Sequence, residues 1–444
     1  MSVISAQEYK ERRKKLIELV QQHHKHEGAI MLLAGFEHDV YRFRQESSFY
    51  YFTGITEPGV VLWLDLNGHA TLFIPNHGNM RSKWVQGVIE VTQEHASALG
   101  MDRVEYLGLP CDSYQLYPFF KAENHQHLLQ TIKQTIDAKK KIFTLYPKTA
   151  YGYIEQRHLL DRLMSFNSEI APAVTDISPI VAQLRRKKSK KEIELLFKAI
   201  EITTLAHEAA AHVIDPGVYE YHVQAALEYV FIESGAQRPS FPSIVGSGKN
   251  STVLHYNQNN RVMDKNDVVV VDIGAEYNYY CADLTRTYPV SGTFTKRQRE
   301  IYNLVLDTQE YIAALAQPGY WLSHKDHPEK SLNHLAKDFL KERGYEKYFP
   351  HGIGHFLGLD VHDVGDASQP LEEGDVITIE PGIYIPEEKI GVRIEDNYWI
   401  VKDGAVCLSE DLPRFADEME KMVTEDLEHE KKAPTKTPRR NVDA

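Results

Sequence analysis

Five side chains that can bind cations occur in strand-like segments of the C-terminal part of the chain. They are Asp272 in VVVVDIG, Asp283 in CADLTRT, His355 in HGIGHFLG, Glu380 in ITIEPGIY and Glu395 in GVRIEDN. An ionised carboxylate in an apolar strand costs roughly several kcal/mol unless it is paired or binds a metal. If the five groups converge, their four negative charges match two divalent cations. Two bridged cations generate hydroxide at neutral pH, which is the chemistry of a hydrolase.

The donor set also predicts the kind of metal. One imidazole and four carboxylates make a hard, oxygen-dominated site, which favours Mn²⁺, with Zn²⁺, Co²⁺ or Fe²⁺ as alternatives, over a thiolate zinc or copper centre. Simpler interpretations remain open for single residues. Asp272 and Asp283 could cap loops or bridge Arg286, and Glu395 could form a surface ion pair with Arg393, with which it shares a strand face.

Three histidines lie within twelve residues of each other. His351 and His355 are four apart, as in helical zinc motifs, but no glutamate follows His351, and Gly352 and Gly354 disfavour a helix. We therefore expect the two imidazoles to have different roles. His362 follows in GLDVHDVG. The alternative is a glycine-rich turn with incidental histidines.

The elements that would position these residues occur twice in the same order. Helices are expected at about 189–212, 218–234, 296–316 and 331–343, and Ser189 with Glu192 forms a capping-box pattern at the first. The first pair precedes the strands of Asp272 and Asp283, which could form a hairpin turning near Tyr277-Asn278. The second pair precedes the strands of the other three groups. Each half alone would leave a sheet face uncovered, so we expect one αβ structure with the five groups between its halves.

The first part of the chain predicts a separate mixed α/β domain. A helix with apolar spacing from Tyr9 to Val20 precedes the strands GAIMLLAGF, VVLWLDL, ATLFIPN and KIFTLYP, and Asn67-Gly68 predicts a hairpin turn. Pro179 marks a break. The basic run 185–188 is interpreted as a solvated linker rather than a nucleic-acid patch, because the rest of the chain is acidic.

The domains expected from these patterns are 1–177 at the N-terminus and 178–424 for catalysis. The remaining 425–444 are polar and contain prolines, so we expect a disordered tail.

Composition limits the class of protein. The chain has 444 residues, 42% of them hydrophobic, and a net charge of −13. These values predict two or three domains with real cores and argue against binding to nucleic acid or to anionic membranes. Three widely separated cysteines predict neither disulfides nor a zinc knuckle. The charged N-terminus has no secretory h-region and no window is long enough to span a membrane, so we expect a cytoplasmic protein.

Several motifs carry a resemblance to a known family. IVGSGKNSTVLHY, VDIGAEYNYYCADLTRTYPVSG, HGIGHFLGLDVHDVG, TIEPGIYI and GVRIEDN stand in the order and spacing of the proline-specific metallopeptidases with the pita-bread fold. This family contains aminopeptidase P, prolidase, the methionine aminopeptidases and creatinase. The resemblance implies an α/β (α+β) fold whose C-terminal pita-bread domain has two pseudo-symmetric αβ halves, after an N-terminal creatinase/aminopeptidase P-like domain. It also implies that the five groups above take the metal-ligand positions.

The resemblance implies roles for neighbouring residues. His255 and His362 resemble the histidines that contact the scissile group and stabilise the tetrahedral intermediate. His351 and Arg393 resemble contacts to the proline and to the groups after it. Glu380 resembles a ligand that also serves as general base. The implied reaction is hydrolysis of the Xaa-Pro bond of proline-containing peptides by a metal-bridging hydroxide, and the implied assembly is a homo-oligomer, a dimer or tetramer.

The choice within the family rests on a few features. Creatinase uses no metal, and methionine aminopeptidases usually lack an N-terminal domain of this size. The short PEEKIG stretch at 386–391 favours aminopeptidase P over prolidase, whereas WVQG at 84–87 lacks an arginine common in aminopeptidase P. Prolidase therefore stays the alternative. A non-catalytic binding protein of the same fold is less favoured, because all five ligand positions are retained.

Overall fold

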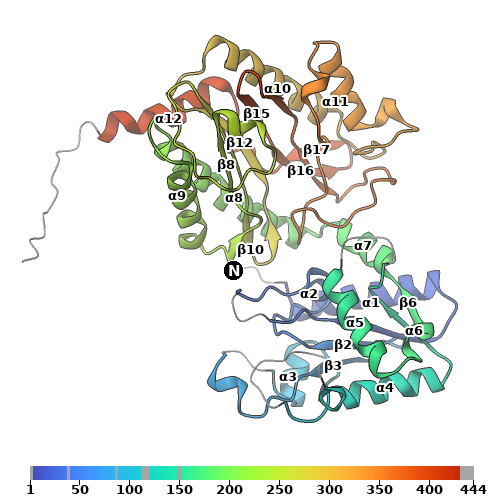
Figure 1. Cartoon of the computed structure of the whole chain (residues 1–444). Coiled ribbons are helices and arrows are strands. Elements are labelled where there is room, and N and C mark those ends of the chain that lie inside the picture. The colour runs from blue at the N-terminus through green and yellow to red at the C-terminus, as the bar shows by residue number, and fades with distance from the viewer. Residues whose placement is uncertain (1–3, 38–40, 86–88, 112–120, 148–152, 431–444) are drawn as a thin grey trace, which may run out of the picture. The chain divides into compact units, whose positions relative to one another are not determined.

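The chain folds into two compact units that divide after Arg185. A computed structural model describes residues 4–37, 41–85, 89–111, 121–147 and 153–430, and Gln86 and Gly87 of the WVQG stretch lie outside them. Helix α7 (Ser178–Arg186) runs up to this division (Figure 1). Pro179 lies in its first turn, where a missing N–H is tolerated, so this proline begins a helix.

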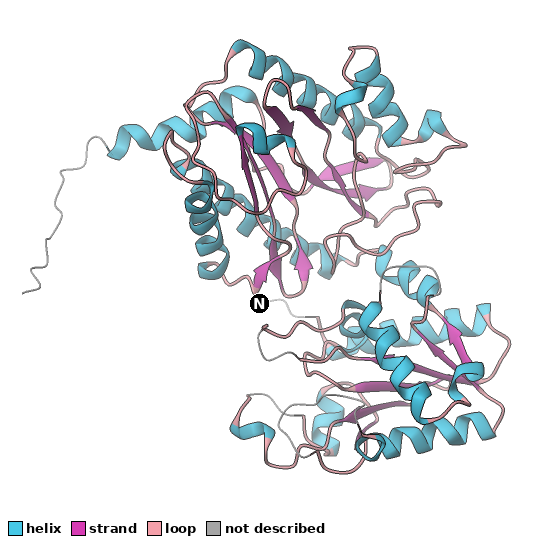
Figure 2. Cartoon of the chain, viewed as in Figure 1, coloured by secondary structure: helices cyan, strands magenta, loops and turns pink. Residues whose placement is uncertain are grey.

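Unit 1 is built on one six-stranded sheet in the order β4-β3-β2-β1-β5-β6 (Figure 2). The strands are β1 (Gly28–Leu33), β2 (Val61–Asp65), β3 (Ala70–Ile74), β4 (Arg103–Tyr106), β5 (Lys141–Thr144) and β6 (Val174–Asp176). The helices are α1 (Ala6–His23), α2 (Ser47–Thr53), α3 (Gln93–Ala98), α4 (Gln126–Asp137), α5 (Ile154–Phe166) and α6 (Ile170–Ala173), with 3₁₀ turns at Arg81–Lys83 and Ala122–His125. The predicted hairpin is confirmed: β2 and β3 pair antiparallel, and Gly68 has a φ of 98°.

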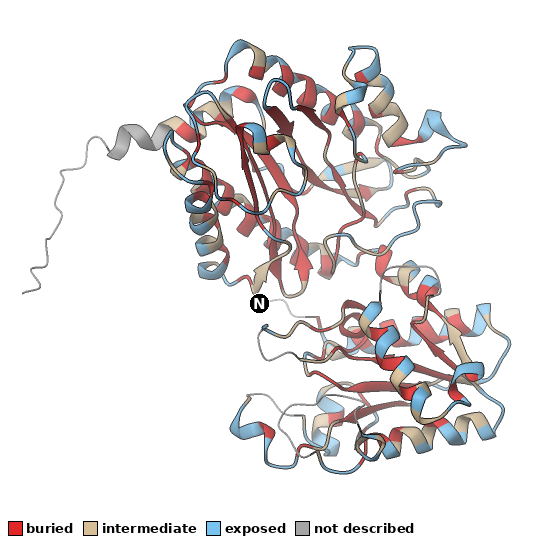
Figure 3. Ribbon diagram, in the orientation of Figure 1, coloured by how far each residue is buried: buried red, intermediate tan, exposed pale blue. Residues whose placement is uncertain are grey.

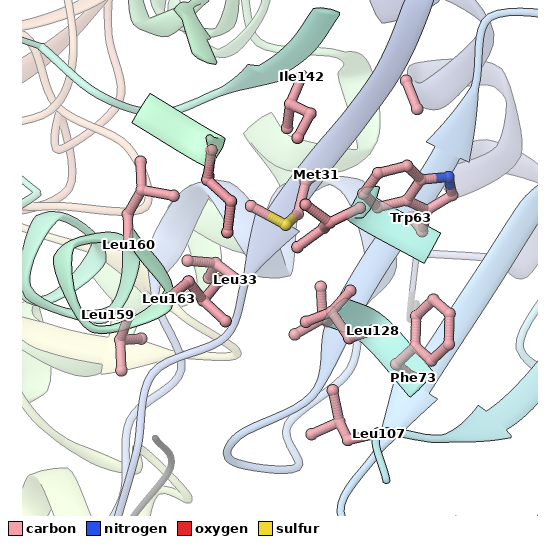
Figure 4. Packing of buried hydrophobic residues seen from close by; sticks show 14 of the residues in the cluster. Met31, Leu33, Trp63, Phe73, Leu107, Leu128, Ile142, Leu159, Leu160 and Leu163 are labelled. Carbon is pink, nitrogen blue, oxygen red and sulfur yellow. The ribbon is translucent and has the colours of Figure 1, made fainter. Parts of the chain in front are cut away.

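The core of unit 1 is apolar. One cluster joins Met31 of β1, Trp63 of β2 and Phe73 of β3 to Leu128 of α4 and Leu163 of α5, all of them buried (Figure 4). Each large side chain of this kind contributes about 1.5–3 kcal/mol by leaving water. The mixed α/β domain expected from the sequence is therefore held by ordinary hydrophobic packing.

Unit 2 contains the four helices predicted from the sequence. They are α8 (Lys190–Val213), α9 (Glu220–Glu233), α10 (Lys296–Leu315) and α11 (Leu332–Lys341), followed by α12 (Ala416–Glu430). The capping box is confirmed, because the Ser189 N–H donates to Glu192 Oε2 at 2.9 Å and the Glu192 N–H donates to Ser189 Oγ at 3.4 Å. Helix α12 includes residues 425–430, which were expected to be disordered, and 431–444 lie outside the described residues.

The strands of unit 2 form three three-stranded sheets, two of them in the first half, and one two-stranded sheet. The first half has β8 (Ile244–Ser247), β9 (Val268–Ile273) and β12 (Leu284–Pro289), with β7 (Arg238–Pro239), β10 (Ala275–Tyr277) and β11 (Tyr280–Cys281) beside them. The second half has β13 (Val376–Ile379), β16 (Asp396–Val401) and β17 (Gly404–Cys407), and the β14 (Gly382–Ile385) and β15 (Ile390–Arg393) hairpin. Short 3₁₀ turns lie at Gly248–Thr252, Pro328–Lys330 and Glu346–Tyr348.

The two halves meet along their strands. Thr285 of β12 and Glu395, just after β15, form an antiparallel bridge. Most strand residues of this unit are buried, whereas the helices alternate buried and exposed faces (Figure 3). This is the αβ arrangement of two similar halves that the repeated element order predicted.

Three of the four residues of the basic run at 185–188 are not solvated, so this interpretation was wrong for them. Arg185, Arg186 and Lys188 are buried. Arg186 Nε lies 2.7 Å from Asp375 Oδ1, and Lys188 Nζ lies 3.0 Å from an oxygen of Asp363. The acidic partners are far away in the sequence, so the local composition could not reveal that these charges are paired.

Candidate metal centre

Asp272 and Asp283 are brought to one end of a hairpin. Strands β9 and β12 pair antiparallel with Thr285 opposite Asp272, so Asp283 lies just before its strand. Strands β10 and β11 extend this hairpin, and their turn lies at Asn278-Tyr279, one residue later than the predicted Tyr277-Asn278. Asn278 and Tyr279 both have positive φ, as in a two-residue type I′ loop. Gly274 allows the close approach of the two chains, because a Cβ there would lie 1.8 Å from the Ala282 oxygen.

The HGIGH segment runs beside the strand that ends at Glu380. The His355 N–H donates to Thr378 Oγ1 at 3.0 Å, and the Glu380 N–H donates to the Ile353 carbonyl at 2.9 Å. Gly354 fits against the Thr378 carbonyl, where a Cβ would come within 2.0 Å. The glycines therefore serve close packing of extended chain, and the segment is not a helical zinc motif.

The side chains of the two halves converge. His355 Nε2 lies 3.4 Å from Asp283 Oδ2 and 3.4 Å from Glu380 Oε1. Asp283, His355 and Glu395 each offer a ligand atom within 4.8 Å of the others. Asn397 of β16 donates to the Asp283 carbonyl at 2.5 Å and accepts from its N–H at 3.2 Å, which ties the hairpin to the second half.

Two cavities open on this cluster, with volumes of about 270 and 250 Å³. Both are lined by His255, Asp272, His355, His362 and Glu380. The larger also contains Asp283 and Glu395 together with Phe241, Pro242, Ile244, Asn257 and Val361; the smaller contains Leu254, His351, Gly352, Gly354 and Arg393. All nine residues that the sequence singled out therefore line one or both cavities.

The cluster is electrostatically strained by its own negative charges. Burial, together with the charges of Asp272 and Glu380, raises the pKa of Asp283 to about 7. Burial likewise raises the pKa of Glu380, and that of Glu395 well above its usual range. For His355, burial opposes the charged form, but the hydrogen bond to Asp283 and the nearby carboxylates raise its pKa to about 9. Groups with such pKa values need added positive charge to stay ionised together.

The chemistry of the side chains fits divalent cations. Asp272 Oδ1 and Glu395 Oε1 are buried and have no hydrogen-bond partner among the described residues. His355 Nδ1 lies 3.0 Å from the Phe356 carbonyl, which can only accept, so in the neutral imidazole the Nε2 lone pair faces the carboxylates. Free carboxylate oxygens and a correctly oriented imidazole are what a hard metal ion requires.

Arg393 does not form the surface ion pair that was considered for it. It is buried, and its Nη2 lies 2.6 Å from Asp272 Oδ2. Glu395 instead accepts a hydrogen bond from Thr285 Oγ1 at 2.7 Å. Arg286, the other arginine considered, pairs with Asp396 at 2.8 Å and not with the hairpin carboxylates.

Tyr384 was missed by sequence reasoning. Its hydroxyl lies 2.9 Å from His351 Nε2 and accepts from Arg393 Nη1 at 2.8 Å, so it joins two of the predicted substrate contacts. The signal was present, because Tyr384 follows Glu380 by four residues in the same motif. Phe241 and Val361 were missed as well, and no local pattern distinguishes them from core residues.

Two histidines beside the cluster, His351 and His362, are suited to hydrogen bonding as neutral imidazoles. Burial and the charge of Arg393 lower the pKa of His351 to about 4. Burial and neighbouring histidines also lower the pKa of His362. The side chains of His255 and His362 are exposed, so a bound molecule can reach both.

Comparisons with known proteins place this geometry in context. Residues 194–402 match the model of metallopeptidase family M24, and residues 9–109 match the N-terminal domain of aminopeptidase P. The chain is 34% identical to the Xaa-Pro aminopeptidase of Escherichia coli (strain K12), over 95% of this chain and 99% of that protein. A Xaa-Pro dipeptidase of Pyrococcus furiosus is 41% identical, over 52% of this chain and 66% of that protein.

Solved structures agree with these matches. The structure of E. coli aminopeptidase P with the inhibitor Pro-Leu superposes with a TM-score of 0.78 at 31% identity, covering 96% of this chain and 100% of that one. In the described residues, no helix combines the length and the apolar character that crossing a bilayer requires.

Proposed function

The chain belongs to metallopeptidase family M24, as a member of the aminopeptidase P type, and on that premise we propose that it releases the N-terminal residue from peptides with proline in second position. The observation that carries the proposal is the convergence of Asp283, His355, Glu380 and Glu395 on a cavity that opens to substrate. The similarity to a Xaa-Pro aminopeptidase extends over nearly the whole chain, including the N-terminal domain. Prolidase activity is the less well supported alternative, since the dipeptidase match covers about half of this chain.

Membership of this family implies divalent metal ions. We propose that Asp272, Asp283, His355, Glu380 and Glu395 hold two of them, with Mn²⁺ as the expected ion and Zn²⁺, Co²⁺ or Fe²⁺ as alternatives. The free oxygens of Asp272 and Glu395 support this assignment. When bound, two divalent ions lower the pKa of a water molecule toward neutrality and polarise a peptide carbonyl.

The side chains of the protein have separate tasks in this proposal. Glu380 accepts the proton of the attacking water, because its carboxylate lines both cavities beside His355. His255 and His362, which are exposed at the cavities, donate hydrogen bonds to the carbonyl oxygen as it gains charge. Thr378 Oγ1, 3.3 Å from Glu380 Oε1, keeps the carboxylate oriented.

The two cavities suggest how the peptide lies. The Xaa-Pro bond is a tertiary amide without an N–H, so recognition depends on the shape of the site on both sides of the bond. We propose that the side chain of the first residue enters the larger cavity beside Phe241, Ile244 and Val361. The proline ring and the groups after it lie in the smaller cavity, beside His351 and Arg393.

Comparing two substrates tests the proposal. Hydrolysis of the dipeptide Gly-Pro and of a tripeptide of the form Xaa-Pro-Yaa is measured with Mn²⁺ present, and the metal content of the purified protein is determined. The tripeptide is expected to be the better substrate. A preference for Gly-Pro would make the protein a prolidase, and absence of both bound metal and turnover would make it a non-catalytic binding protein.

We also propose an organisation for the whole protein. Residues 178–424 form the catalytic domain and 1–177 the N-terminal domain, and the two family matches fall within these ranges. By resemblance to the family we propose a homo-oligomer, a dimer or tetramer, which light scattering on the purified protein would test. We further propose a reducing, cytoplasmic compartment, since the sequence has only three cysteines and they lie far apart, with no CxxC pair.

A further inference from the structure

Lys188 is a buried cation two residues before helix α8. Its Nζ lies 3.0 Å from Asp363 Oδ2, and each of the two side chains is 1% exposed. Replacing a buried ion pair by apolar groups is often neutral or stabilising, so stability alone does not explain why a lysine stands here. The pair is therefore expected to hold a neighbouring part of the chain in place.

The pair occupies the space beside Gly358, which lies between His355 and His362 in the sequence. A Cβ on Gly358 would lie 2.1 Å from Asp363 Oδ2 and 2.8 Å from Lys188 Cε. The Gly358 carbonyl accepts a hydrogen bond from the Cys281 N–H at 2.8 Å, two residues before Asp283. Lys188 and Asp363 thus pack against the loop at 356–363 at the residue whose carbonyl is bonded to the hairpin of Asp272 and Asp283.

This loop ends with the proposed catalytic histidine. Asp363 follows His362 directly, and its N–H donates to the Phe356 carbonyl at 2.9 Å, which closes the loop. The ring of His362 packs edge-on against that of His355, with centroids 4.3 Å apart. Since the His362 side chain is exposed, its position depends on how firmly the backbone beside it is held.

We propose that Lys188 is a positioning residue that acts through Asp363 to hold His362 at the substrate carbonyl. The inference rests on the proposed function, because it assigns His362 its role in that reaction. A catalytic group displaced by about 1 Å can lose about 10²-fold in rate, so a pair this close to His362 can control turnover without touching substrate.

A double-mutant cycle tests this inference. Lys188→Met is made in the native protein and in the His362→Ala variant, and kcat and KM for a Xaa-Pro-Yaa tripeptide are measured with Mn²⁺. In the native background kcat is expected to fall about tenfold or more, with metal content retained. In the His362→Ala background, Lys188→Met is expected to leave the residual kcat unchanged, because the group it positions is absent.

A neighbouring lysine provides the matched control. Lys187 is exposed and pairs with Glu372, so Lys187→Met is expected to keep kcat, KM and metal content. If Lys188→Met does not fold because Asp363 loses its buried lysine partner, the double variant Lys188→Met/Asp363→Asn removes both charges and replaces it in the cycle. Gly358→Ala, which displaces the pair sterically, should reproduce the loss of kcat.

Three outcomes would overturn the inference. They are an equal loss of kcat in both backgrounds, loss of bound metal in Lys188→Met, and unchanged kcat in all variants that break the pair. Native protein assayed in parallel separates this failure from that of the proposed function. If the native protein does not cleave Xaa-Pro bonds at all, the function fails; if it does, only the role of Lys188 is at stake.

Discussion

The strands of the two units bury different kinds of side chain. In unit 1, strands β1, β2 and β3 bury apolar side chains such as Met31, Trp63 and Phe73. In unit 2, the strands β9 and β15 are equally buried along their length, but a carboxylate stands near the end of each, Asp272 and Glu395. The first sheet is complete when its side chains have packed. The strands of unit 2 leave buried carboxylates whose negative charge Arg393 and His355 offset only in part.

Because of this difference, we expect the two units to be stabilised in different ways. Apolar packing does not depend on a ligand, so unit 1 should respond to changes in its core. The raised pKa values of Asp283, Glu380 and Glu395 indicate that the site of unit 2 is unfavourable without positive charge. Metal binding should therefore stabilise unit 2 selectively.

The largest effect is expected where the charges meet. Glu380→Ala should reduce kcat at least about 10³-fold, because it removes both the proposed base and a metal ligand. Steady-state hydrolysis of a Xaa-Pro-Yaa tripeptide and metal analysis of the purified variant measure the two losses. Glu387→Ala, an exposed position, serves as the control. Turnover like that of the native protein in metal-supplemented buffer would contradict the double role of Glu380.

A substitution in the core of unit 1 should lower stability and leave metal content unchanged. Leu163→Ala should lower the free energy of unfolding by about 3 kcal/mol, since loss of the buried side chain leaves a cavity in the apolar cluster of unit 1. Denaturant unfolding monitored by circular dichroism measures this loss, with Ser165→Ala at an exposed position as control. Metal content should stay normal. Loss of metal from Leu163→Ala would mean that the two units are not independent in this respect.

Removing the metal should act on unit 2 alone. If the ions are present at about 100 times their Kd, chelation lowers its stability by about 2.7 kcal/mol. Hydrogen exchange is the suitable measurement, because peptides from β9, β12 and β13 should exchange faster while those from β1 to β3 keep their rates. Uniform acceleration, or none, would count against a selective role of the cations.

His362→Ala tests whether the histidine near the cluster is a catalyst or a ligand. We expect kcat to fall about 10²-fold while metal content stays normal, because the imidazole acts on the carbonyl oxygen. The same measurements on His334→Ala, outside the cavities, give the control. If His362→Ala loses its metal, His362 is a ligand and its assigned role is wrong.

Much of unit 2 could be predicted from local patterns. Helix α8 was found because its apolar spacing and the Ser189–Glu192 capping box are local signals. The hairpin of Asp272 and Asp283 was found because β-rich runs flank a turn, although the turn lies at Asn278-Tyr279. The five cation-binding groups stood out because carboxylates are rare in apolar strands.

Long-range pairing could not be predicted in this way. Lys188 and Asp363 are 175 residues apart, and Arg186 and Asp375 are 189 apart, so a basic run next to a helix looked solvated. Arg393 was compared with Glu395, its neighbour in the strand, whereas its partner Asp272 comes from the other half. Such partners become visible only when the fold brings the segments together.

The smallest expected effect concerns the larger cavity, where apolar side chains adjoin the charged cluster. Phe241 lies before β8 and lines this cavity together with Ile244 and Val361. Phe241→Ala should lower kcat/KM for a tripeptide with a bulky apolar first residue about tenfold relative to one beginning with glycine, because an apolar contact contributes about 1–3 kcal/mol to discrimination. Leu254→Ala, in the smaller cavity, should leave this ratio unchanged while it alters the response to the residues after the bond. An equal loss for both substrates would show that Phe241 supports the metal centre and does not select the first residue.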